Sequence, residues 1–180
     1  MLDDIERWVA DARAEDAAGE RVRERWLRQQ AEEEATFAGV LVEVAERGVT
    51  VTVTGVSGRR HQGRVAAVGA DFVALRAESG RLTLLALGSV ARIRLAPPDR
   101  RVSGSPRDGA QRSEVTLAEV LAQAVARRPR LSVHSGADHL LGELRSVGVD
   151  VLSISVDDQT SGLTYARLAS VSEISFLDSG

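Results

Sequence analysis

The sequence predicts a mainly β protein made of two small five-stranded barrels in tandem, each preceded by a short helix, behind a long N-terminal helix. Short runs of Val, Leu and Ile, separated by glycines, extend from residue 49 to 95, as in strands joined by tight turns. The same pattern returns about 80 residues later, after a stretch rich in Pro and Gly. These observations indicate that one β unit has been duplicated.

Residues 1–35 are predicted to form the long N-terminal helix, which is acidic. They carry 11 acidic residues against 6 arginines, and Trp8 and Trp26 are 18 residues apart. That spacing is five helical turns, so both tryptophans are expected on one face. Two interpretations stay open: the helix binds a protein partner through these tryptophans, or it packs on the barrels of its own chain.

The first barrel is predicted over residues 36–96. Its helix begins at Thr36 and ends at Gly48, with an apolar stripe between them. In residues 49–54 valine and threonine alternate strictly, which is typical of a strand with one buried and one exposed face. Further strands are expected at about 59–68, 72–77, 82–87 and 90–95.

Residues 97–115 are predicted to be a linker, because they are rich in Pro, Gly and Arg and contain few apolar residues. The second barrel is predicted over residues 116–180. It begins with a capping box of Thr116 and Glu119.

The second barrel repeats the first at a nearly constant offset. Leu131 matches Val51 at an offset of 80, and Gly142 matches Gly63 at an offset of 79. The offset changes only in predicted turns, where chains tolerate insertions. We therefore expect the same strand order in both units, and a bend at the glycine inside each second strand.

Three segments of the first unit carry a family resemblance: Gly58-Arg-Arg-His-Gln-Gly63, Val68-Gly-Ala-Asp-Phe-Val-Ala-Leu75 and Leu85-Ala-Leu-Gly-Ser-Val-Ala-Arg-Ile93. With their matches in the second unit, they resemble the Sm-like (SH3-like) fold, the family that includes the RNA chaperone Hfq. The whole chain is also similar to a family of uncharacterised proteins from GC-rich bacteria. The resemblance implies self-association in which the fourth strand of one barrel pairs with the fifth of the next. The result would be a pseudo-dimer within the chain or a ring of six barrels.

The residues with which that family reads RNA bases are missing here. Asp71 and Asp150 stand where Hfq has an aromatic residue, and Leu85-Ala86-Leu87 replaces its Tyr-Lys-His run. We therefore expect a non-enzymatic module for assembly or protein interaction, with Trp8 and Trp26 as candidate partner-binding residues.

The alternative function is binding of RNA or single-stranded DNA through the first unit. Residues 36–98 carry 8 arginines against 4 acidic residues, whereas residues 116–180 carry 5 against 8. Strand alternation places Arg60 and Arg64 on one face, and likewise Arg92 and Arg94. Such residues are suited to phosphate contacts, although arginine is also ordinary on solvated strand faces. The candidate nucleic-acid-binding residues are Arg59, Arg60, His61, Arg64, Arg92 and Arg94.

Other chemistry finds little support in the sequence. The chain has no cysteine, which excludes disulfides and thiolate sites. The three histidines lack metal-ligand spacing, and no nucleophile elbow or phosphate-binding loop occurs. We expect no catalytic residue, no metal and no cofactor. No apolar run approaches the roughly 20 residues of a membrane span, so a cytoplasmic location is expected.

Overall fold

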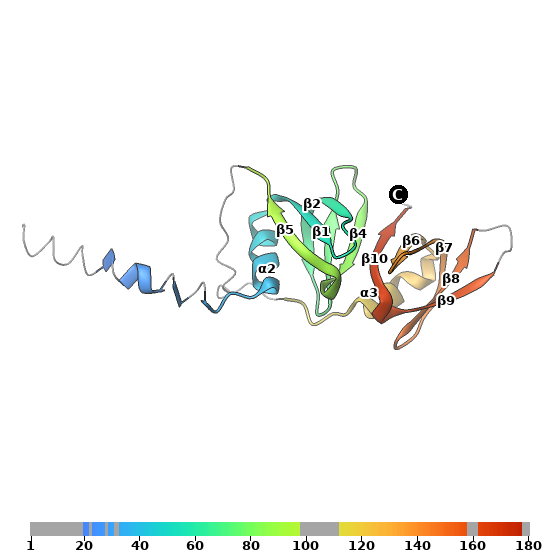
Figure 1. Ribbon diagram of the computed structural model, residues 1–180. Coiled ribbons are helices and arrows are strands. Elements are labelled where there is room, and N and C mark those ends of the chain that lie inside the picture. Colours follow the sequence, from blue (N-terminus) through green and yellow to red (C-terminus); the bar gives the residue numbers. More distant parts are fainter. Residues whose placement is uncertain are drawn as a thin grey trace, which may run out of the picture.

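Ten antiparallel strands and two short helices form the body of the protein (Figure 1). The structure is a computed structural model that describes residues 20–21, 23–27, 29–30, 33–97, 112–157 and 162–177. The helices are α2 (Phe37–Arg47) and α3 (Leu117–Ala124), and each precedes five strands.

The strands of the first half are β1 (Thr50–Gly55), β2 (Arg60–Val68), β3 (Phe72–Arg76), β4 (Leu82–Ala86) and β5 (Val90–Leu95). Those of the second half are β6 (Arg130–Ser135), β7 (Asp138–Val147), β8 (Val151–Val156), β9 (Leu163–Arg167) and β10 (Val171–Phe176). Single turns of 3-10 helix are η1 (Leu87–Ser89), η2 (Val125–Arg127) and η3 (Leu168–Ser170).

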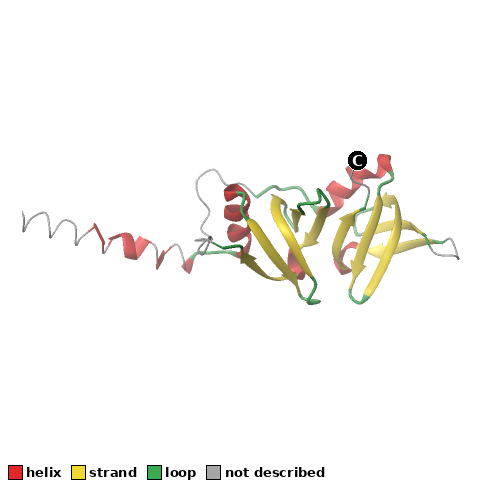
Figure 2. Cartoon of the chain, turned by 90° about the horizontal axis from the view of Figure 1, so that it is seen from above, coloured by secondary structure: helices red, strands yellow, loops and turns green. Residues whose placement is uncertain are grey.

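The prediction of two separate five-stranded Sm-like barrels is wrong. The strands form a single open sheet in the order β5-β1-β2-β3-β4-β10-β6-β7-β8-β9, and no pairing between described strands closes either half. The halves are joined where β4 pairs with β10. Figure 2 shows the strands of the two halves, in yellow, side by side. Hairpins and glycine turns look alike in a closed barrel and in an open sheet, so the pattern could not distinguish them. The fourth-to-fifth strand pairing expected within the chain is present.

The internal repeat predicted from the sequence is visible in the strand register. Val51 pairs with Gly63 on one side and with Leu95 on the other, and Leu131 pairs in the same way with Gly142 and Phe176. A register shift follows the glycine in both second strands. Paired strand residues of one half therefore have structural counterparts in the other.

Both helices begin as their sequences predict. The Thr36 hydroxyl accepts a hydrogen bond from the Gly39 amide, and Gly48 ends α2 in the left-handed region at φ 60°. The predicted capping box of Thr116 and Glu119 is formed at α3. These caps satisfy amides that a helix leaves without an internal acceptor.

Two apolar cores lie on opposite faces of β3 and β4. The first contains Leu41 and Val44 of α2 together with Leu85, and the second contains Leu121 of α3 together with Leu84. Phe72 is buried in the second core. Because neighbouring residues of one strand point to opposite faces, the central strands serve both cores, and the second half packs against the first.

The long N-terminal helix is also a wrong prediction. The longest helix with described ends is α2, of 11 residues, and the described residues between 20 and 33 are helical and exposed. None of the described helices is long and apolar enough to cross a membrane.

The predicted linker is described only at its ends. Residues 98–111 lie outside the described residues. Beyond them, the Ser113 amide donates to the Val68 carbonyl at 2.9 Å, and the Val115 carbonyl accepts from the Ala70 amide at 2.8 Å. The entry to α3 is thus fixed on the β2–β3 turn. The domain boundaries at 35, 96 and 115 stay predictions.

Candidate functional site

Two of the six predicted nucleic-acid-binding residues contact the other half of the chain. The Arg59 side chain donates to both carboxylate oxygens of Glu173, at 2.9 and 3.2 Å. His61 Nε2 lies 3.0 Å from the same carboxylate. Glu173 belongs to β10 and is 4% exposed, so Arg59 and His61 form part of the β4–β10 junction.

The junction holds Glu173 in its charged form. Burial alone would raise the pKa of the Glu173 carboxyl, but hydrogen bonds from His61 and Arg59 outweigh it and lower the pKa to about 2. Deeper in the junction, the hydroxyls of Thr83 and Ser175 are hydrogen-bonded at 2.9 Å and buried. Polar pairs thus fix the register of this strand pair.

The other four predicted arginines share one exposed face of the first half, which we call the arginine face. Thr54 pairs with Arg60 on β2 and with Arg92 on β5. Thr52 pairs with Arg94, and Thr50 pairs with Arg64. Paired residues point to the same side of an antiparallel sheet, so the prediction that these arginines share faces is confirmed. The arginine face consists of Thr50, Thr52, Thr54, Arg60, Gln62, Arg64, Arg92 and Arg94.

The arginine face is hollowed along β1, because threonines are shorter than the arginines on both sides. A small hollow of about 40 Å³ is lined by Thr52, Thr54, Arg60, Arg92 and Arg94. A larger one, of about 300 Å³, lies beside Arg64 and is lined also by Arg76 and Glu78. None of the four arginines forms an ion pair with another residue in the described part of the chain.

The same face of the second half has a different charge. His139 and Glu143 are the counterparts of Arg60 and Arg64, and Glu173 is the counterpart of Arg92. His134 and His139 stack there with ring centroids 4.2 Å apart. Burial lowers the pKa of His134, against the opposing effect of Glu173. The fold therefore does not require arginine at these positions.

The free edge of the second half exposes apolar side chains. Tyr165 on β9 is 67% exposed, whereas its counterpart Leu84 is 1% exposed beneath the second half. Leu163 is half exposed, and Val149, in the turn between β7 and β8, is 99% exposed. A position-by-position comparison of the repeats could have identified Tyr165 as an uncovered counterpart of Leu84. That comparison requires knowing that β4 is covered by the second half. We call Val149, Leu163 and Tyr165 the apolar edge.

A hollow of about 530 Å³ lies between the halves, beside this edge. It is lined by Asp71, the first residues of α3, Val149, Asp150 and η3. One Asp71 carboxylate oxygen accepts a hydrogen bond from the Leu117 amide at 2.7 Å. Asp71 thereby caps α3 from the neighbouring half, whereas its counterpart Asp150 has no side-chain partner among the described residues.

The predicted partner-binding tryptophans are only partly described. Trp8 lies outside the described residues, and Trp26 is 62% exposed. The Trp26 side chain is thus mostly exposed, and the partner-binding role of both residues stays a prediction.

A comparison with protein-family models and with curated proteins found no match to this chain. That result does not test the family resemblance, which stays a prediction. Among the described residues, no group of three or more His, Asp or Glu side chains could hold a metal ion.

Proposed function

We propose that the chain is a non-enzymatic, cytoplasmic assembly module whose copies associate head to tail. The β9 edge of one copy would pair with the β5 edge of the next and repeat the β4–β10 junction. The observation that carries the proposal is the exposure of Tyr165 at the position where Leu84 is buried. A sheet edge with uncovered apolar side chains is suited to pairing with another strand.

The register of the internal junction defines the proposed one. Leu84 pairs with Ile174, and Thr83 pairs with Ser175. The corresponding pairs between copies are Tyr165 with Ile93 and Thr164 with Arg94. The Arg94 guanidinium could donate a hydrogen bond to the Thr164 hydroxyl, in place of the bond between Thr83 and Ser175.

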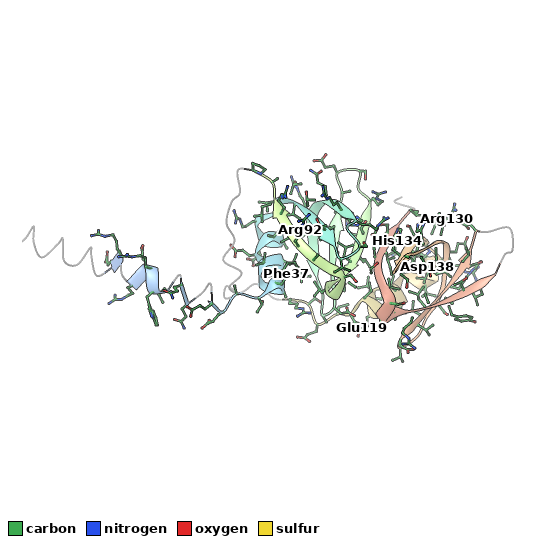
Figure 3. The ribbon with its side chains drawn as sticks, in the orientation of Figure 1. Phe37, Arg92, Glu119, Arg130, His134 and Asp138 are labelled. Carbon is green, nitrogen blue, oxygen red and sulfur yellow. The ribbon has the colours of Figure 1, made fainter. Side chains whose placement is uncertain are left out.

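The ion pair of the internal junction would be repeated between copies with its charges reversed. At the internal junction Arg59 binds Glu173, and the counterparts of these residues are Asp138 and Arg92. Figure 3 labels Arg92 on the first half and Asp138 on the second. Neither has an ion-pair partner among the described residues. Opposite charges at matching positions of two free edges favour association.

The helix cap offers a further contact between copies. Asp71 caps α3 across the internal junction, and the counterpart of that contact joins Asp150 of one copy to the α2 N-terminus of the next. Phe37 begins α2 and is exposed, whereas its counterpart Leu117 is buried. Assembly would therefore cover Phe37 as the internal junction covers Leu117.

Such an interface joins different surfaces of the two copies. Head-to-tail contacts close into a ring or continue as a filament, depending on the rotation between copies. A ring of six units, one of the two alternatives expected from the sequence, would contain three chains.

A charge-reversal cycle tests this interface. Asp138→Arg and Arg92→Asp should each shift the full chain towards monomer in sedimentation velocity, because each places like charges together. Combining them in one chain restores an opposite pair at every junction and should recover assembly. The control, Glu78→Arg with Arg81→Asp, changes exposed residues of the β3–β4 turn and should leave assembly unchanged. Single variants that assemble like the wild type, or a combination that fails although circular dichroism shows it folded, would refute the interface.

A further inference from the structure

We propose that the arginine face binds the sugar–phosphate backbone of a single-stranded nucleic acid without reading its bases. This activity does not depend on assembly, although the interface between copies would use Arg92 and Arg94 of the same face. It uses four of the six arginine and histidine positions singled out in the sequence. Arg59 and His61 are not part of the proposed binding surface, because their side chains contact the Glu173 carboxylate.

The donors of the arginine face lie in three rows across the strands. Arg92, Thr54 and Arg60 form the first row, and Arg94, Thr52 and Gln62 form the second. Thr50 and Arg64 form the third. Successive rows are two residues apart along β1, or about 7 Å. Every row contains a guanidinium, so a chain of phosphates running along β1 would meet a cation at each step.

Threonine gives this surface its shape. Small side chains along β1 form a floor between the arginines of β2 and β5, and the hollow of about 40 Å³ lies over Thr52 and Thr54. Hydroxyl groups donate hydrogen bonds to phosphate oxygens, and guanidinium groups bind them in a fork of two donors. A phosphate in this hollow would therefore find both kinds of donor.

The composition of the face indicates which part of a nucleic acid it contacts. It contains no aromatic residue, and base recognition in single strands usually depends on stacking against aromatic rings. The phosphate backbone supplies the sequence-independent part of the affinity. The face is thus equipped to bind strands of any sequence.

Within one chain the four arginines are available for a ligand, and the proposed interface between copies would use only Arg92 and Arg94. They have no ion-pair partner among the described residues, and the second half carries His139 and Glu143 in place of Arg60 and Arg64. The second half has the same strand pairing without arginine at these positions. The fold therefore does not explain why the first half carries four cations here.

Assembly would affect only one side of the arginine face. The counterparts of Arg92 and Arg94 are Glu173 and Ser175, which the internal junction buries. The counterparts of Arg60 and Arg64 are not buried at that junction. Substitutions on β2 therefore test nucleic-acid binding without altering the proposed interface between copies.

The test is fluorescence anisotropy with the full chain and labelled 20-nucleotide strands. The probes are uridine-rich, adenine-rich and abasic strands, and inorganic polyphosphate serves as competitor. We expect the three strands to bind with similar affinity, which falls as salt is added. The double variant Arg60→Gln with Arg64→Gln should bind about tenfold more weakly or worse. It should also make the slope of log affinity against log salt less steep by about 1.4, for two lost phosphate contacts.

The control is Arg127→Gln with Arg167→Gln, which removes the same charge from exposed positions of the second half and should bind like the wild type. Loss of binding to the abasic strand would overturn backbone recognition, and equal binding by the β2 variant would overturn the site. Absence of salt-dependent binding to every strand would overturn the whole proposal. Polyphosphate that binds when no strand does would assign the face to that polymer instead.

Discussion

Glu173 connects the two halves through side-chain contacts. Its carboxylate accepts hydrogen bonds from Arg59 and lies within hydrogen-bond distance of His61, both of which precede it by more than 110 residues. The sequence shows the arginine and the histidine but not the carboxylate that folds against them. Arg59 and His61 were therefore predicted as ligands of nucleic acid, although they stabilise the junction.

Replacing Glu173 should destabilise the protein in a pH-dependent way. Its pKa in the folded state, about 2, lies below the ordinary value of 4.5. The charged Glu173 carboxylate therefore stabilises the folded state above pH 4.5. This stabilisation is lost as the pH falls from 4.5 towards 2. Glu173→Gln should lower the free energy of unfolding at pH 7 by about 2–3 kcal/mol in urea denaturation. The difference from the wild type should shrink over that pH range.

Glu143→Gln is the matched control. Glu143 pairs with Arg145 at 3.1 Å on the surface of the same half, where an ion pair contributes about 0–1 kcal/mol. A Glu173→Gln variant as stable as this control at pH 7, or equally destabilised at pH 7 and pH 2, would contradict the role given to the junction.

At the scale of the elements, residue patterns predicted the local structure well. Alternation along β1 predicted one buried face, and Val51 and Val53 are buried there. The capping box at Thr116 and the glycine end of α2 are also present. The pairing of β4 with β10 could be suggested only by family resemblance, because backbone hydrogen bonds make the contact and every strand edge offers the same groups.

The glycine inside β2 has a specific structural reason. A Cβ atom at Gly63 would lie 2.5 Å from the Arg76 carbonyl oxygen of the neighbouring strand. Gly63→Ala should therefore force β2 and β3 apart and cost about 1–3 kcal/mol. Gly88→Ala is the control, because a Cβ there meets no atom within 4 Å and the backbone is unstrained. Chemical denaturation that gives both variants wild-type stability would show that β2 does not depend on this close approach.

At the scale of the whole molecule, the repeat accounts for both proposed surfaces. One half ends in the arginine-bearing edge β5 and the other in the apolar edge β9, while their equivalents β10 and β4 are paired within the chain. The sequence predicted the duplication and the charge difference, but not that the halves share one sheet and that the second core reaches across to Leu84. Those features depend on contacts between residues about 90 positions apart.

Sedimentation velocity of the full chain over a concentration series tests the central claim most directly. Head-to-tail pairing predicts species larger than the 19.3 kDa chain whose share rises with concentration, because two free edges remain on every monomer. Tyr165→Asp, which places a charge in the apolar edge, should shift the distribution to monomer. A single 19.3 kDa species at every concentration would contradict assembly through β5 and β9.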